Sequence, residues 1–287
     1  MNSPEPSVGH QDDRLLLVTR LVALVIIPFL LAAAAVLYFS GEAMGQRFAW
    51  DIQPPPTAFL VGSGYLGGAY FFVRVVFERR WHRVAAGFLP VAAYTLVMLL
   101  ATLVHWDRFD PSHFPFLVWL ILYIVTPLGL PLIWALNRRT DPGTAEPDDA
   151  LVAPALRRIM AAIGGLVLVG AVVFFLLPEA IADIWPWTLS PLTARVLAGW
   201  HVLLGAGALA LSVERRWSAW RIPLQSIALW QALMLLNMLR AAAHLGSTGL
   251  FNWYAIYALM GLLAIVVLYV IMERRRSKIG FRAGGGE

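Results

Sequence analysis

The chain has 287 residues, of which 60% are hydrophobic and only 14% are charged. A water-soluble globule of this length would need more polar residues to cover its surface, so the composition indicates a protein surrounded by lipid. The absence of cysteine excludes disulfides, thiolate metal sites, cysteine nucleophiles and iron–sulfur clusters. The net charge of +5 comes from arginines at the ends of apolar segments, so we expect no nucleic-acid partner.

Eight apolar runs are long enough to cross a bilayer, for which a helix needs roughly 20 residues. The first run is too long for a signal-peptide core and lacks a convincing cleavage site, so we expect it to be retained. The sequence therefore predicts an all-α polytopic membrane helix bundle with eight transmembrane helices. We expect the spans at 15–39, 58–77, 84–104, 114–136, 159–178, 192–213, 222–243 and 253–272.

Basic residues are distributed unevenly between the two ends of these spans. The sparse end holds only Arg47, Arg108, Arg195 and Arg240. Since cytoplasmic loops are enriched in Lys and Arg, we expect the rich end and both termini in the cytoplasm, and the chain in the bacterial cytoplasmic (inner) membrane. The rich end holds Arg14, Arg79, Arg80, Arg83, Arg138, Arg139, Arg157, Arg158, Arg215, Arg216, Arg221, Arg274, Arg275, Arg276, Lys278 and Arg282.

Parts of the sequence recur at an offset of 136 residues, which predicts an internal repeat of one four-helix unit. An even number of spans per unit gives both units the same orientation, so the symmetry axis should run along the membrane normal. The matches are Pro55, Thr57 and Ala58 with Pro191, Thr193 and Ala194; Glu78-Arg79-Arg80-Trp81 with Glu214-Arg215-Arg216-Trp217; and Met98-Leu99-Leu100 and Leu103 with Met234-Leu235-Leu236 and Leu239.

Polar stretches divide the chain. We expect a disordered cytoplasmic tail at 1–13, a first repeat at 14–137, a linker at 138–157, a second repeat at 158–273 and a basic tail at 274–287, with the last helix ending near Glu273. The glycines in that tail follow no strand and open no helix, so a phosphate loop is not expected.

Local chemistry marks one helix start and several close helix contacts. Ser190 is placed to cap a helix that has Pro191 at its first position. Tryptophans near the span ends fit an aromatic belt at the membrane interface better than a ligand platform. Small residues let helices approach closely in lipid, and two spans carry them. Two interpretations of these small residues stay open, an interface between the repeats and a homodimer interface. The residues are Gly64, Gly68, Gly199, Gly205 and Gly207.

The best candidate site is a set of polar residues within the second repeat. Polar groups are costly in a bilayer, so those retained are candidates for function. Helical spacing places three of them on one face of the seventh span, and counting from the span ends places others at similar depth. The opposing interpretation is that these groups only hydrogen-bond helices together or snorkel. The predicted outward-facing, ligand-binding pocket consists of His201, Gln231, Asn237, Arg240, His244 and Arg195.

Two further groups of polar residues have simpler explanations. A cluster at the outer end of the third span has no zinc-ligand spacing and reads better as a solvated loop with local ion pairs, so we expect no metal site. It consists of His105, Asp107, Arg108, Asp110 and His113. Arg74 and Glu78 are four residues apart and are expected to pair at the inner surface.

Two Trp-containing stretches, WPWTLSPLTAR at 185–195 and LVHWDRFD at 103–110, resemble those of uncharacterised Trp-rich polytopic integral membrane proteins of high-GC bacteria. The preference for Arg over Lys fits this resemblance. It implies a multi-pass fold and carries no activity, cofactor or site residue.

Three functions remain open. The first is a non-enzymatic protein that binds or transports a small solute, which the paired arginines suggest is anionic, without a cofactor. The second is a haem- or quinone-binding redox protein that uses His201 with His105 or His244. The third is a structural or assembly subunit. Hydrolysis and proton pumping are disfavoured because no Asp or Glu lies within a span.

Overall fold

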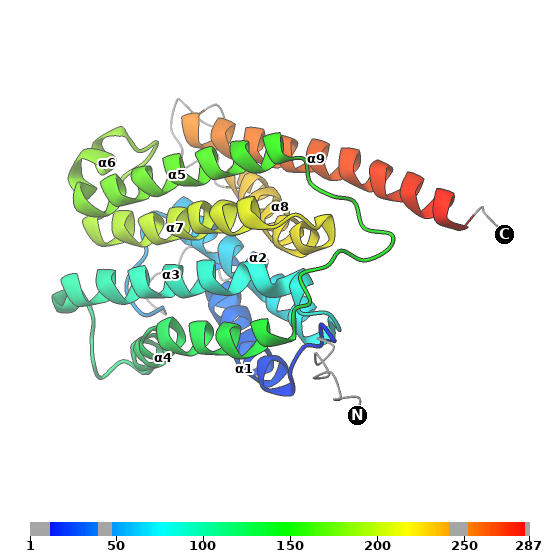
Figure 1. The fold of residues 1–287 in the computed structure, drawn as a ribbon. Coiled ribbons are helices and arrows are strands. Elements are labelled where there is room, and N and C mark those ends of the chain that lie inside the picture. The colour runs from blue at the N-terminus through cyan, green and yellow to red at the C-terminus, as the bar shows by residue number, and fades with distance from the viewer. Residues whose placement is uncertain (1–11, 40–47, 241–251, 285–287) are drawn as a thin grey trace.

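The computed structural model describes residues 12–39, 48–240 and 252–284, and in these parts every regular element is helical (Figure 1). Eight helices of the described residues are long and apolar enough to cross a membrane. The elements are α1 (Leu17–Ala34, continued by a π-helical turn, Ala35–Phe39), α2 (Pro55–Phe77), α3 (His82–Val104), α4 (Phe114–Asn137), α5 (Pro154–Leu176), α6 (Pro178–Ile184), α7 (Pro191–Val213), α8 (Trp217–Arg240) and α9 (Trp253–Gly284).

The all-α, multi-pass prediction is confirmed, with differences at helix ends. α5 begins at Pro154 and α8 at Trp217, each several residues before the predicted start, because their first turns accept polar residues outside the apolar run. The short helix α6 was not predicted. α9 continues past Glu273 to Gly284, so the predicted stop there is wrong: strong helix formers such as Arg and Lys extend the helix beyond the apolar stretch.

The two ends of the bundle differ in chemistry. The N- and C-terminal ends lie on the same side in Figure 1, together with the linker between α4 and α5. We call this side the basic end and define it by the loops 78–81 and 214–216 and the linker 138–153. The opposite side, formed by 48–54, 105–113 and 185–190, is called the Trp-rich end.

The two groups of four long helices interlock rather than standing side by side. α1 packs on α2, α3 on α4, α5 on α7 and α8 on α9. The central contacts run between the groups, with α2 against α8, α3 against α7, and α3 against α8. Helices that follow each other, α2 and α3 or α7 and α8, touch only marginally. The bounds of α2, Pro55–Phe77, recur 136 residues later in α7, Pro191–Val213.

Glycines mark the closest approaches between these helices. A Cβ on Gly64 of α2 would lie 2.5 Å from the ring of Trp200 on α7, and a Cβ on Gly199 would lie 2.4 Å from Met98 on α3. These two contacts join the two groups of helices. Within the second group, Gly164 of α5 faces the backbone of Gly205 on α7. In lipid, apolar burial gives little driving force for helix association, and close backbone contact of this kind stabilises the helix pairs instead.

The start of α7 follows the predicted capping chemistry. The hydroxyl of Ser190 accepts a hydrogen bond from the backbone N–H of Thr193 at 3.2 Å, and Pro191 occupies the first helical position. This satisfies one of the amide donors that a helix start leaves unpaired. The prediction for Ser190 and Pro191 is confirmed.

Two adjacent glycines of α5 provide a matched test of this packing. In Gly164→Ala the added Cβ would lie 2.8 Å from the carbonyl oxygen of Gly205, whereas at Gly165 a Cβ has open space. We expect Gly164→Ala to lower the free energy of unfolding by about 1–3 kcal/mol through overpacking. Gly165→Ala should be neutral or stabilise by up to about 1 kcal/mol. Thermal unfolding in detergent measures both, and equal effects of the two changes would contradict close α5–α7 packing.

Candidate ligand-binding cavity

A cavity of about 420 Å³ lies inside the second group of helices. One wall is the α5–α7 pair and the other is the α8–α9 pair, while residues of α2 and α3 form the base. It exists because α7 and α8 are held apart: α7 packs on α3 and α5, whereas α8 packs on α2 and α9. The volume lies within the range of about 300–1,000 Å³ typical of small-molecule sites.

The cavity is apolar and uncharged. Among the described residues that line it there is no Asp, Glu, Lys, Arg or His. Its few polar side chains include Ser226, whose hydroxyl donates to the carbonyl of Gly67 at 2.8 Å and is therefore satisfied. Of the glycines in the lining, Gly207 faces open space, because a Cβ there would meet no atom within 4 Å. A molecule that fits here must be apolar over most of its surface.

Gln231 is the exception within this lining. It is 8% exposed and lines the cavity from α8, and its carbonyl oxygen has no hydrogen-bond partner in the described part of the chain. Its amide nitrogen lies where a Cβ on Gly261 of α9 would clash, so only glycine leaves it room. The indole N–H groups of Trp200 and Trp230, which also line the cavity, are buried without partners among the same residues. Each such group costs about 1–3 kcal/mol.

The first group of helices contains a polar tie between two of its members. There, Asn137 at the end of α4 ties that helix to the start of α1. Its side-chain oxygen accepts from Thr19 at 2.6 Å and from the Leu16 backbone at 3.1 Å, and its nitrogen donates to the Arg14 carbonyl at 3.0 Å. These bonds tie the end of α4 to the start of α1, although the two helices otherwise touch only marginally.

In the second group the residue 136 positions after Asn137 is Glu273 of α9. Its carboxylate accepts from the indole of Trp217 at 2.8 Å and pairs with Arg221, both on α8. The end of α9 is therefore tied to α8 instead of α5. This difference leaves α5 and α9 free to diverge around the cavity.

The structure describes five of the six residues of the predicted pocket and does not gather them around one space. Gln231 lines the cavity. His201 faces aromatic rings of Phe174, Tyr254 and Tyr257, and its Nδ1–H donates to the Leu197 carbonyl at 2.8 Å. His244 lies outside the described residues.

The other three predicted residues connect helices. Asn237 donates to Ser63 of α2 at 3.3 Å and accepts from Arg240 at 3.2 Å, while the Arg240 guanidinium lies over the rings of Tyr38 and Phe59. Arg195 donates to the Phe175 carbonyl at 3.0 Å and to Nε2 of His105 at 2.7 Å. The two arginines that suggested an anion are therefore occupied at separate places.

The other polar residues singled out in the sequence, His105 and Arg74, also hydrogen-bond side chains of the protein. His105 is held by Arg195, and burial together with that guanidinium lowers the pKa of His105. Within the described ranges, no three His, Asp or Glu side chains form a group that could hold a metal ion. The predicted Arg74–Glu78 pair is wrong: Arg74 instead donates to Tyr70 and Gln225, because the helix ends before Glu78.

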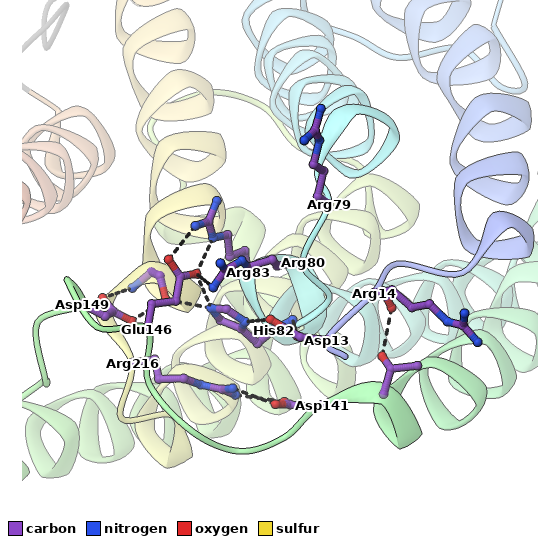
Figure 2. Close-up of polar contacts among 12 residues, drawn as sticks. Asp13, Arg14, Arg79, Arg80, His82, Arg83, Asp141, Glu146, Asp149 and Arg216 are labelled. Atoms are coloured by element: carbon purple, nitrogen blue, oxygen red, sulfur yellow. Dashed lines mark hydrogen bonds and ion pairs between the residues drawn. The ribbon is translucent and has the colours of Figure 1, made fainter. Parts of the chain in front are cut away.

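A buried polar cluster at the basic end was not predicted (Figure 2). Asp13 hydrogen-bonds Nδ1 of His82, and Nε2 of His82 lies 2.9 Å from the hydroxyl of Ser218. That hydroxyl donates to Asp149. Each of these residues is at most 8% exposed. The cluster joins the N-terminal segment, the start of α3, the linker and the start of α8.

The order Asp–His–Ser resembles a hydrolytic triad, but the geometry serves another purpose. The Ser218 proton is directed to Asp149, so His82 is not its acceptor. Ser218 is only 2% exposed, which leaves no room for a substrate carbonyl. The bonds instead link counterparts: Asp13 and Asp149, and His82 and Ser218, are each 136 residues apart. The cluster is therefore a structural tie between the two groups of helices.

Ion pairs surround this tie. Glu146 of the linker accepts two hydrogen bonds from Arg83, at 2.8 and 2.7 Å, and pairs with Arg80 (Figure 2). Arg216 is paired with Asp141 at 2.7 Å and with Glu214 at 2.6 Å. The expected tail at 1–13 and the linker thus contribute ordered residues. A sequence signal existed, since an acid precedes each first span at the 136-residue offset.

No protein-family model, curated protein or solved structure matches the chain. The assignment of function therefore depends on the geometry described above.

The ion pairs around the tie predict a dependence of stability on pH. Burial raises the pKa of Asp141, Glu146 and Glu214, but hydrogen bonds from Arg216 and Arg83 outweigh it and hold each pKa below its ordinary value. The stabilisation is therefore complete above the ordinary carboxyl pKa of about 4 and is lost as the pH falls through the lower folded-state values.

We expect the unfolding temperature in detergent to fall below about pH 4. Glu146→Gln should lower this temperature near neutral pH and flatten its decline in acid. Asp107→Asn is the control, because Asp107 pairs with Arg108 while 75% exposed. A change as large in Asp107→Asn would contradict the role of the buried pairs.

Proposed function

We propose that this multi-pass membrane protein binds an uncharged, lipid-soluble small molecule in the cavity between the α5–α7 and α8–α9 pairs, without catalysing a reaction. The observation that carries the proposal is Gln231, a buried amide with an unpartnered carbonyl oxygen in an otherwise apolar, charge-free lining. A ligand with one polar group would satisfy that amide and fill the apolar space at the same time.

The proposal departs from an anionic solute for electrostatic reasons. An anion in a cavity without a cationic side chain would lose its hydration without compensation, which costs far more than an unpaired neutral group. Arg195 and Arg240, the two arginines of the pocket predicted from sequence, are engaged outside the cavity lining. An uncharged ligand avoids that cost.

The orientation is part of the proposal. The positive-inside rule places the basic end in the cytoplasm of a bacterium, and the Trp-rich end outside. The recurrence of helix bounds and of the Asp13 and Asp149 contacts at one offset supports an origin of the two groups of helices as copies of one unit.

Filling the cavity should abolish binding. Gly207 lines the cavity and a Cβ there meets no atom within 4 Å, so Gly207→Leu places a side chain in the empty space without a clash at Cβ. We expect it to reduce labelling of the lining helices by a photoreactive long-chain alcohol at least tenfold, as mapped by mass spectrometry. Gly170→Leu is the matched control, because Gly170 also has open space but lies outside the lining. Labelling of both variants at the wild-type level would overturn the proposal.

Removing the amide should remove the preference for a polar head. The wild-type protein is expected to bind a long-chain alcohol about 3- to 10-fold more tightly than the matching alkane, since a hydrogen bond in a membrane protein is worth about 1 kcal/mol. Gln231→Leu should bind both equally, as measured by competition with the photoreactive alcohol. Gln225→Leu removes an amide of the same helix outside the lining and should keep the preference. Retention of the preference in Gln231→Leu would contradict this role.

A further inference from the structure

The cavity has a polar end and an aliphatic end. Trp200, Trp230, Gln231 and Tyr257 gather at one end, near the middle of their bundle. Gln231 is 14 residues from the start of α8 at Trp217, which corresponds to about 21 Å along the helix. Toward the basic end the lining is aliphatic, with Leu156, Leu211, Leu224 and Leu268. This gradient matches a molecule with a small polar head and a hydrocarbon chain.

Described aromatic and apolar side chains pack at both ends of the second group of helices. At the Trp-rich end, Phe174, Trp185 and Tyr254 pack around His201. At the basic end, Trp217 and Trp220 are fully buried and pack with other apolar side chains beneath the ion pairs. A ligand entering from either aqueous side would have to disrupt one of these layers.

The side of the bundle between α5 and α9 is different. Ile163 of α5 and Ala264 of α9 both line the cavity, and both are classed as exposed, Ile163 at 47%. They border the cavity and the lipid at once. Among the described residues, the tie that Asn137 and Thr19 make in the first group has no counterpart between α5 and α9, where Glu273 binds α8 instead. Figure 1 shows α9 running at an angle to α5.

Building on the proposed function, we infer that the ligand is a lipid with a single hydrocarbon chain and a small uncharged head, and that it enters sideways from the bilayer between α5 and α9. The head reaches Gln231 and the chain occupies the aliphatic end. A volume of about 420 Å³, near the lower limit for ligand sites, suits one chain rather than a two-chain phospholipid. The charged headgroup of a phospholipid would also lack a partner in the lining.

The absence of native cysteine makes a direct test of the entry route clean. Ile163 is nine residues from the start of α5 at Pro154, and Ala264 is nine residues from Glu273, so both lie at comparable depth. In the double variant Ile163→Cys/Ala264→Cys, a cleavable bifunctional thiol reagent would bridge the gap. We expect bridging to slow labelling by the photoreactive long-chain alcohol at least tenfold, and reductive cleavage to restore the rate. Each single-cysteine variant with the same reagent serves as control.

The outcomes separate the two proposals. Failure of the alcohol to label the lining of the unbridged protein would overturn the proposed function itself. Normal labelling with a rate unchanged by bridging would leave the cavity intact and overturn entry between α5 and α9. A photoreactive phosphatidylcholine is the test of ligand class: it should leave the buried lining residues Trp200 and Gln231 unlabelled, and labelling of them as strong as that by the alcohol would overturn the single-chain assignment.

Discussion

Hydrogen bonds and ion pairs between polar side chains at the basic end tie particular helices of this protein to one another. Lipid surrounds the helices with a medium as apolar as their own side chains, so burying leucine against leucine favours no particular neighbour. Asn137 draws α4 onto α1, while Glu273 holds α9 against α8. Positions 137 and 273, which are 136 residues apart, thus tie their helices to different neighbours, and the cavity borders α5 and α9.

The interlocked packing of the two groups holds the bundle together without a tie between α5 and α9. α2 and α7 each contact helices of the other group, with Gly64 beneath Trp200 and Gly199 beneath Met98. The core between the groups therefore stays closed even though α5 and α9 diverge. Trp200 and Trp230 lie in this central layer, where they contact Gly64 and Gly67 of α2.

The spans and the Ser190 cap were predictable because they depend on local properties, namely the length of apolar runs and the chemistry of one helix start. The cavity was not, because it depends on which helices are neighbours. A space shared by His201, Arg195 and Arg240 requires the sixth and seventh spans, which follow each other in sequence, to face each other. In the structure α7 and α8 hardly touch, and those residues meet other partners. Of the five predicted residues that the structure describes, only Gln231 lines the cavity, since it faces α9.

His82 and Ser218 are different amino acids that contact each other at positions 136 residues apart. In an assembly of two identical four-helix chains, residues that meet at the twofold axis come from the same position of each chain. The positions of His82 and Ser218 would then carry the same amino acid. Two imidazoles there would compete for one location between Asp13 and Asp149. A single polypeptide lifts that restriction, because one position can keep the ring and the other can supply a small hydroxyl. Because both groups of helices belong to one chain, the two positions that meet can hold different amino acids, His82 and Ser218.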